Sequence, residues 1–222
     1  MDYKKNKEYF DDNSISSGVV LIIIGVIVCL SSGGINTGLF VGISFIFFGI
    51  IGIFAVVSHM SDSQYDASVR PVSTVLRNRA LEKLGIDADE VNEIEPIIFH
   101  GYEYSGKEGI LVKQGKDEKW RSNLYKAVSL FFSANEVHCY TLNYYTTEPK
   151  ETEETDVYFY KDIVSISTGS EMVEGRSFSR EYFKLITAGG SSLVVSLSDT
   201  KNAQRSINGM RSLIKLKKQE NA

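Results

Sequence analysis

Uncharged, mostly apolar residues fill the chain from residue 18 to 57, and this is the clearest hydropathy pattern in the sequence. The stretch divides into two apolar runs, Val19–Leu30 and Gly38–Val57, joined by the turn-rich linker S-G-G-I-N-T. A helix that crosses a bilayer needs about 20 apolar residues and satisfies its own backbone hydrogen bonds. The pattern therefore predicts a transmembrane helical hairpin over residues 17–57, after an N-terminal tail over residues 1–16.

Two other interpretations of the apolar runs fit the sequence less well. The first run could belong to a secretory signal peptide, because three lysines precede it. Two aspartates lie beside its apolar core, however, and no A-x-A-like cleavage site follows. A hairpin buried inside a soluble core would need more chain than is present to cover 40 uncharged residues.

Glycines recur through the second run, and small residues allow helix backbones to approach closely in lipid. The candidate helix–helix packing residues are Gly38, Gly42, Gly49 and Gly52. They could pack the two helices of one hairpin together, which we favour, or join copies in a homo-oligomer.

Basic residues lie on both sides of the hairpin, and the linker between the runs contains none. The positive-inside rule then places both termini in the cytoplasm of a multi-pass protein of the cell inner membrane. Channels and proton relays carry ionisable groups at membrane depth, whereas these runs carry none. The hairpin is therefore expected to be an anchor, with the lipid bilayer as its integral partner.

Residues 58–95 are predicted to be a helical linker, because apolar residues after Pro71 recur at helical spacing and Gly85 supplies a stop. Over residues 96–222 the pattern changes to short segments rich in Val, Ile, Tyr and Phe, separated by turn signals. This pattern predicts a small antiparallel β-barrel or sandwich. A final helical stripe closes it: Ala203, Ile207, Met210 and Ile214.

Two segments of the β-rich part carry a family resemblance. They are F-F-S-A-N-E-V-H-C-Y, which starts at Phe131, and V-Y-F-Y-K-D-I-V-S-I, which starts at Val157. The first resembles the strand–turn–strand opening of the bacterial pleckstrin-homology-like (PH-like) fold, and the second resembles its recurring aromatic-x-D-I-x-x-I step. The resemblance covers residues 97–218 and implies a binding or assembly module rather than a catalyst.

The composition of the 222-residue chain limits the chemistry that we expect of it. Its net charge of −4 argues against a nucleic-acid partner, and its two distant cysteines, Cys29 and Cys139, argue against a disulfide scaffold. The three histidines lack metal-ligand spacing, and the sequence contains neither a nucleophile elbow nor a dinucleotide fingerprint. We therefore expect no enzyme activity, no catalytic or metal-binding residue and no cofactor.

One basic segment is a candidate contact for anionic lipid headgroups or for a protein partner. Its residues are Lys113, Lys116, Lys119 and Arg121. Asp117 and Glu118 interrupt the segment, so a solvated β-hairpin is the alternative.

These observations predict an α+β membrane protein with a transmembrane helical hairpin, followed by a cytoplasmic antiparallel PH-like β-barrel or sandwich with a C-terminal helix. The expected function is a membrane-anchored, non-enzymatic interaction or scaffold protein that binds a protein partner or forms a homo-oligomer. The alternative is an oligomerising membrane sensor or effector, for stress or phage defence, whose hairpin perturbs the membrane.

Overall fold

The computed structural model describes residues 1–11, 15–32, 34–35, 37–57, 60–70, 73–106 and 108–220. In the helices at 15–31 and 37–57, it describes side chains only for residues between 18 and 52. Its α-helices are α1 (Tyr3–Phe10), α2 (Ile15–Ser31), α3 (Thr37–Val57), α4 (Asp62–Val69), α5 (Ser73–Leu84) and α6 (Thr200–Glu220). Its strands are β1 (Ile97–Glu103), β2 (Val112–Gln114), β3 (Trp120–Ser122), β4 (Leu124–Phe132), β5 (Glu136–Tyr145), β6 (Glu151–Phe159), β7 (Ile163–Met172), β8 (Ser179–Thr187) and β9 (Ser192–Ser196). A 3₁₀ turn, Tyr160–Asp162, joins β6 to β7.

All strands pair in antiparallel fashion, so the chain is an α+β protein with antiparallel sheets. One sheet has the order β1-β4-β5-β6, a second has the order β7-β8-β9, and β2 and β3 form a separate ribbon. The two larger sheets meet where β1 passes β9, and a Cβ atom on Gly101 would lie 2.4 Å from the Ser196 carbonyl oxygen. Glycine at this position therefore permits the close crossing of the two strands.

Both faces of the central strand β4 are buried, which explains its almost uninterrupted apolar sequence. Val128, Leu130 and Phe132 point into the main core, between the sheets and α6. Tyr125 and Phe131 point the other way, into a second cluster that also contains residues of α1, α4 and α5.

The C-terminal helix α6 covers the main core with the stripe that its spacing predicts. Ala203, Ile207, Met210 and Ile214 are all buried, so this expectation is confirmed. The edge strand β6 differs, because most of its residues are exposed and four of them are acidic. Charged residues on an edge strand discourage pairing with another sheet.

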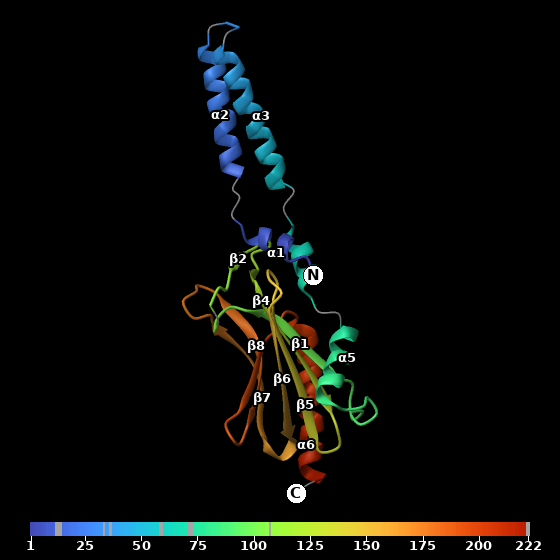
Figure 1. The fold of residues 1–222 in the computed structure, drawn as a ribbon. Coiled ribbons are helices and arrows are strands. Elements are labelled where there is room, and N and C mark those ends of the chain that lie inside the picture. Colours follow the sequence, from blue (N-terminus) through green and yellow to red (C-terminus); the bar gives the residue numbers. More distant parts are fainter. Residues whose placement is uncertain are drawn as a thin grey trace.

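Helices α2 and α3 pack side by side and project away from the sheets (Figure 1). Within the described ranges of the chain, however, no helix is both long enough and apolar enough to cross a membrane. Helix α2 has 17 residues, and at 1.5 Å per residue it extends about 25 Å, against a hydrocarbon core of about 30 Å.

The prediction of a transmembrane hairpin is therefore wrong, and so are the membrane-protein class and the multi-pass inner-membrane location with cytoplasmic termini. The prediction rested on the number of uncharged residues in 17–57. Several of these residues lie in the turn between Ser31 and Thr37, so α2 is shorter than that number suggests.

Candidate functional site

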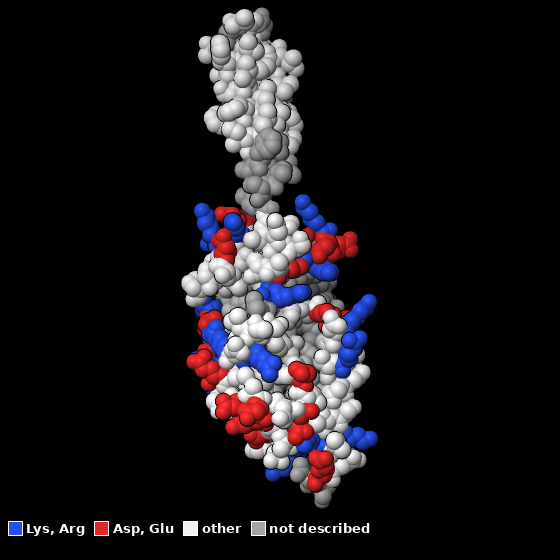
Figure 2. Space-filling view, turned by 90° about the vertical axis from the view of Figure 1, so that its right-hand side faces the viewer, with Lys and Arg blue, Asp and Glu red and all other residues white. Residues whose placement is uncertain are grey.

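The hairpin α2–α3 is the least polar surface of the molecule, and no charged residue occurs between positions 18 and 57. Figure 2 shows the described part of the hairpin without any Lys, Arg, Asp or Glu, whereas these residues are scattered over the body below it. Exposed apolar surface of this extent usually marks an interaction site. We therefore take the hairpin and its attachment to the body as the candidate site.

Glycines form the contact between the two helices of the hairpin. A Cβ atom on Gly42 would lie 2.7 Å from the Gly25 carbonyl oxygen, and one on Gly49 would lie 2.7 Å from the Gly18 carbonyl oxygen. Such distances are too short for any side chain, so glycine lets the backbones touch. Two candidate glycines remain. A Cβ atom on Gly52 would lie 3.8 Å from the Gly18 Cα atom, which is ordinary contact, and Gly38 is partly buried.

Short helices at both roots of the hairpin attach it to the body. Helix α1 ends at Phe10, shortly before α2, and α4 begins at Asp62, shortly after α3. Ser61 caps α4: its hydroxyl accepts a hydrogen bond from the Gln64 backbone N–H, and the Gln64 side chain accepts one from the Ser61 N–H. This reciprocal capping box fixes the start of α4 in the chain.

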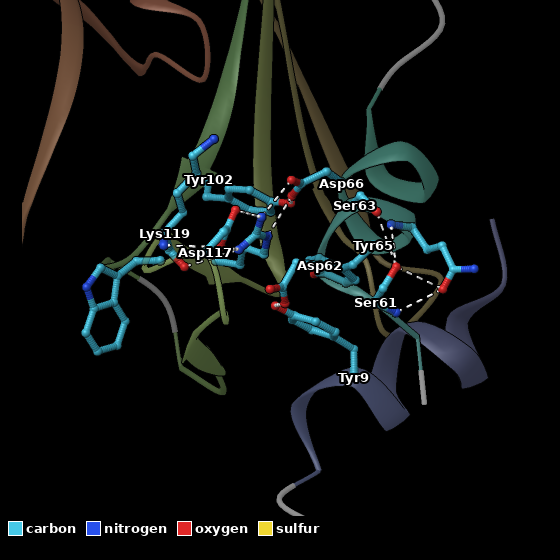
Figure 3. Close-up of polar contacts among 12 residues, drawn as sticks. Tyr9, Ser61, Asp62, Ser63, Tyr65, Asp66, Tyr102, Asp117 and Lys119 are labelled. Atoms are coloured by element: carbon cyan, nitrogen blue, oxygen red, sulfur yellow. Dashed lines mark hydrogen bonds and ion pairs between the residues drawn. The ribbon is translucent and has the colours of Figure 1, made fainter. Parts of the chain in front are cut away.

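A polar cluster, which we call the collar, joins both roots to the β2–β3 ribbon (Figure 3). Its members are Tyr9, Asp62, Asp66, Asp117 and Arg121. They come from α1, from α4, and from the turn and second strand of the ribbon.

Arg121 is the centre of the collar, and only 1% of its surface is exposed. Its guanidinium donates to both carboxylate oxygens of Asp66 at 2.8 Å, and to those of Asp117 at 2.7 and 2.8 Å. The remaining N–H donates to the Lys119 carbonyl oxygen at 3.2 Å. All five donors of the guanidinium therefore have partners within the chain.

These hydrogen bonds keep the carboxylates of Asp66 and Asp117 ionised. The bonds from Arg121 hold the pKa of Asp117 well below its usual range. Burial alone would raise the pKa of Asp66, but hydrogen bonds from Arg121 and Tyr102 outweigh it and lower that pKa. The hydrogen bonds to Asp117 and Asp66 likewise raise the pKa of Arg121, so the cluster stays charged.

The root before α2 is attached through Tyr9. Its hydroxyl donates to Asp62 at 2.8 Å, and the second oxygen of that carboxylate accepts the Lys116 backbone N–H at 2.7 Å. Lys113 Nζ donates to the Tyr9 carbonyl oxygen at 2.8 Å. The Tyr9 ring also stacks on Tyr65 of α4, with ring centres 4.3 Å apart. Both roots of the hairpin therefore contact each other as well as the body.

Buried hydrogen bonds continue from the roots into the sheet. Tyr65 is fully buried, and its hydroxyl donates to the Ser122 carbonyl oxygen at 2.9 Å. Asn6 of α1, also fully buried, donates to the Thr146 carbonyl oxygen at 2.9 Å. Since buried polar groups are costly to leave unpaired, these bonds specify one position for each root helix.

The structure divides the predicted basic segment into two groups. Arg121 and Lys113 bond to the collar and to α1, and Arg121 keeps no N–H for a ligand from outside the chain. Lys116 and Lys119 are exposed. The segment therefore joins the root helices α1 and α4 to the ribbon, and a contact with lipid or a partner remains a prediction for the two exposed lysines.

Sequence reasoning missed the acidic half of the collar. Asp117 was interpreted as an interruption of the basic segment, although it is a partner of Arg121 four positions away. The presence of one arginine among lysines was the available signal, because the planar guanidinium favours paired carboxylates.

Other polar features of the described residues do not gather into a comparable site. A groove of about 530 Å³, which Asp66 and Arg121 of the collar help to line, also contains Arg180, which pairs with Glu103 and Glu171. Cys139 is buried in β5, and burial raises the pKa of its thiol to about 12. In the part of the chain that the structure describes, no three His, Cys, Asp or Glu side chains lie close enough together to hold a metal ion.

Comparison of the chain with protein families, with curated proteins and with solved structures finds no match. The interpretation of the site therefore depends on its own geometry.

Proposed function

We propose that this chain is a non-enzymatic interaction protein, in which a PH-like β domain presents the apolar hairpin α2–α3 to a protein partner. One observation carries the proposal: the outer surface of the hairpin is exposed and apolar, while the collar holds both of its roots. The hairpin is the docking element, and the collar holds the two short helices that flank it in the chain.

The exposed side chains of the hairpin are large. Leu30 is 81% exposed, and Phe47 and Phe48 are about 60% exposed. Soluble proteins rarely expose contiguous apolar patches of more than a few hundred Å² without an interaction function. Burial of this surface against a partner would release water from it and supply the main driving force for association.

The collar limits the freedom of the two root helices. Order that exists before binding does not have to be created on binding. Because Arg121 links α4 to the ribbon and Tyr9 links α1 to α4, both root helices are already fixed relative to the sheet.

The PH-like assignment of the β domain is part of this proposal. In its support, a four-stranded and a three-stranded antiparallel sheet are followed by one terminal helix, which is the order that the resemblance implies. The long buried strands provide a stable platform for the hairpin.

Photo-crosslinking in cells tests the proposal. A benzophenone amino acid replaces Phe47 on the hairpin in one variant, and in the matched control it replaces Phe159, which is 48% exposed on β6. We expect protein adducts from position 47 and few from position 159. No adducts at 47, or equal adducts at both positions, would contradict a docking role for the hairpin.

A further inference from the structure

We infer that the occupant of the hairpin surface is the hairpin of a second copy of this chain, so that at least four helices pack side by side. This inference rests on the proposed function and names its partner. It is carried by the arrangement of inward and outward residues on α2 and α3, by the exposed area and by the absence of charge.

The inward residues of each helix recur at steps of three or four. In α2 they include Gly18, Ile22, Gly25 and Cys29, and in α3 they include Gly42, Ile46, Gly49 and Gly52. Steps of three and four are the spacing of helices that pack along their length. The inward residues of each helix form one such packing surface, which we call the hairpin seam, and it is buried in the contact between α2 and α3.

The outward residues contain further series at steps of three and four, and all of them are large and apolar. The outward side chains of α2 are Val19, Val20, Ile23, Ile24, Val26, Ile27 and Leu30. Those of α3 are Phe40, Val41, Ile43, Phe47, Phe48, Ile50 and Ile51. Each helix thus carries additional apolar stripes that are suited to packing against a further helix.

The exposed area is sufficient for a stable contact. A fully exposed large apolar side chain presents roughly 150 Å², so these half-exposed residues together present on the order of 1,000 Å². A standard interface buries about 800 Å² on each partner. Because these residues are spread around the hairpin, one partner covers roughly half of their area; with an equal area on the second copy, the contact buries on the order of 1,000 Å² in total, which is what a specific interface needs.

The absence of charge favours a second copy over an unlike protein. Residues 18–57 contain no Asp, Glu, Lys, Arg or His, so the hairpin surface cannot form ion pairs with a partner. Its partner surface must be equally apolar and must carry stripes of matching spacing. The hairpin meets both conditions itself, and a two-fold interface uses the same patch on both copies.

The mass of the full chain in aqueous buffer without detergent tests this inference, because detergent would itself cover the apolar surface. The hairpin variant combines Ile27→Lys with Phe47→Lys, which adds two charges to the outward stripes in residues of good helix propensity. The matched control combines Val164→Lys with Met172→Lys, at positions of β7 that are equally exposed. We expect the natural chain and the control to have at least twice the monomer mass, and the hairpin variant to lose association at least tenfold.

Disulfide trapping gives a second, independent readout. In a Cys29→Ser background, Ile27→Cys and Phe47→Cys are expected to form covalent dimers on oxidation, whereas the inward Ile22→Cys is not. A monomeric natural chain, a hairpin variant of unchanged mass, or equal trapping at inward and outward positions would overturn the inference.

The two proposals can fail separately. If the natural chain is monomeric and the photo-crosslinker at position 47 captures a different protein, the second-copy inference is wrong and the docking function stands. If the chain is monomeric and position 47 captures no protein, both are wrong.

Discussion

The collar joins the short helices on either side of the hairpin, but opposite kinds of interaction stabilise the hairpin and the collar. In the hairpin, glycines bring two backbones into contact without a single charged group. In the collar, one buried arginine donates to two carboxylates and a carbonyl group. The hairpin contact depends on shape and tolerates no added volume, whereas the collar depends on complete pairing and tolerates no missing partner.

Removal of the collar cation should have the largest effect. Arg121→Met leaves the Asp66 and Asp117 carboxylates without their shared partner and should lower the free energy of unfolding by about 3 kcal/mol. Arg121→Lys should recover only part of the lost free energy of unfolding, because an ammonium group cannot form paired contacts with each carboxylate. Denaturant unfolding followed by the fluorescence of Trp120, the only tryptophan, measures the effect in the body.

The matched control for this variant is Lys116→Ala, in which an exposed side chain is removed from the same ribbon. Its stability should change by less than about 0.5 kcal/mol. Equal stability of the Arg121→Met and Lys116→Ala variants would show that the collar does not stabilise the molecule.

Added volume in the hairpin seam should have an intermediate effect. A side chain at Gly42 would meet Cys29 Sγ at 2.5 Å, so Gly42→Leu should separate α2 from α3 at a cost of about 1–3 kcal/mol. The rate at which a thiol reagent labels Cys29 should increase, while Cys139 stays protected in the core. Gly209→Ala, in a helix with open space around it, should leave that rate unchanged.

Acid should weaken the body and leave the hairpin seam intact. Hydrogen bonds from Tyr140, Arg79 and Lys83 lower the pKa of Glu153 from 4.5 to about 2. The stability that this carboxylate supplies is fully present above pH 4.5 and is lost as the pH falls through 2. Residues 18–57 contain no group that titrates in this range.

Unfolding curves at pH 6 and pH 3, followed by Trp120 fluorescence, check this expectation. Tyr140→Phe removes the largest contribution to the lowered pKa, so the difference between the two curves should shrink. A difference of the same size in that variant would count against the assignment to Glu153.

The smallest effect concerns the turn of the ribbon. Glu118 has φ of 63°, a left-handed conformation that glycine and asparagine adopt more readily. Glu118→Asn should therefore raise the free energy of unfolding by about 0.5 kcal/mol without any change in assembly. A decrease in stability would mean that the Glu118 side chain has a favourable contact that outweighs its backbone strain.

Much of the fold could be predicted from local patterns. The two apolar runs form α2 and α3, the stripe from Ala203 to Ile214 lies in the core, and the strand-rich part has antiparallel sheets. These patterns are local, because they depend on residues two to four positions apart. The transmembrane assignment is wrong because no helix of the described residues is long and apolar enough to cross a membrane, and the count of uncharged residues overstated the length of α2.

The collar could not be predicted in the same way. Asp66 and Arg121 are 55 positions apart, and Tyr9 and Asp62 are 53 apart. Their pairing requires the fold to bring α1, α4 and the ribbon together, and no local spacing encodes that arrangement. A basic segment on its own is compatible with a ligand site or with an internal ion pair, and burial decides between the two.

The most direct test of the account is a distance measurement between spin labels in the full chain. One label replaces Phe47 in a Cys29→Ser background, so each molecule carries it on the outward face of α3. We predict a defined intermolecular distance, short enough for two hairpins in contact, that disappears when Ile27→Lys is added. A label that reports no second copy nearby at any protein concentration would contradict docking between hairpins.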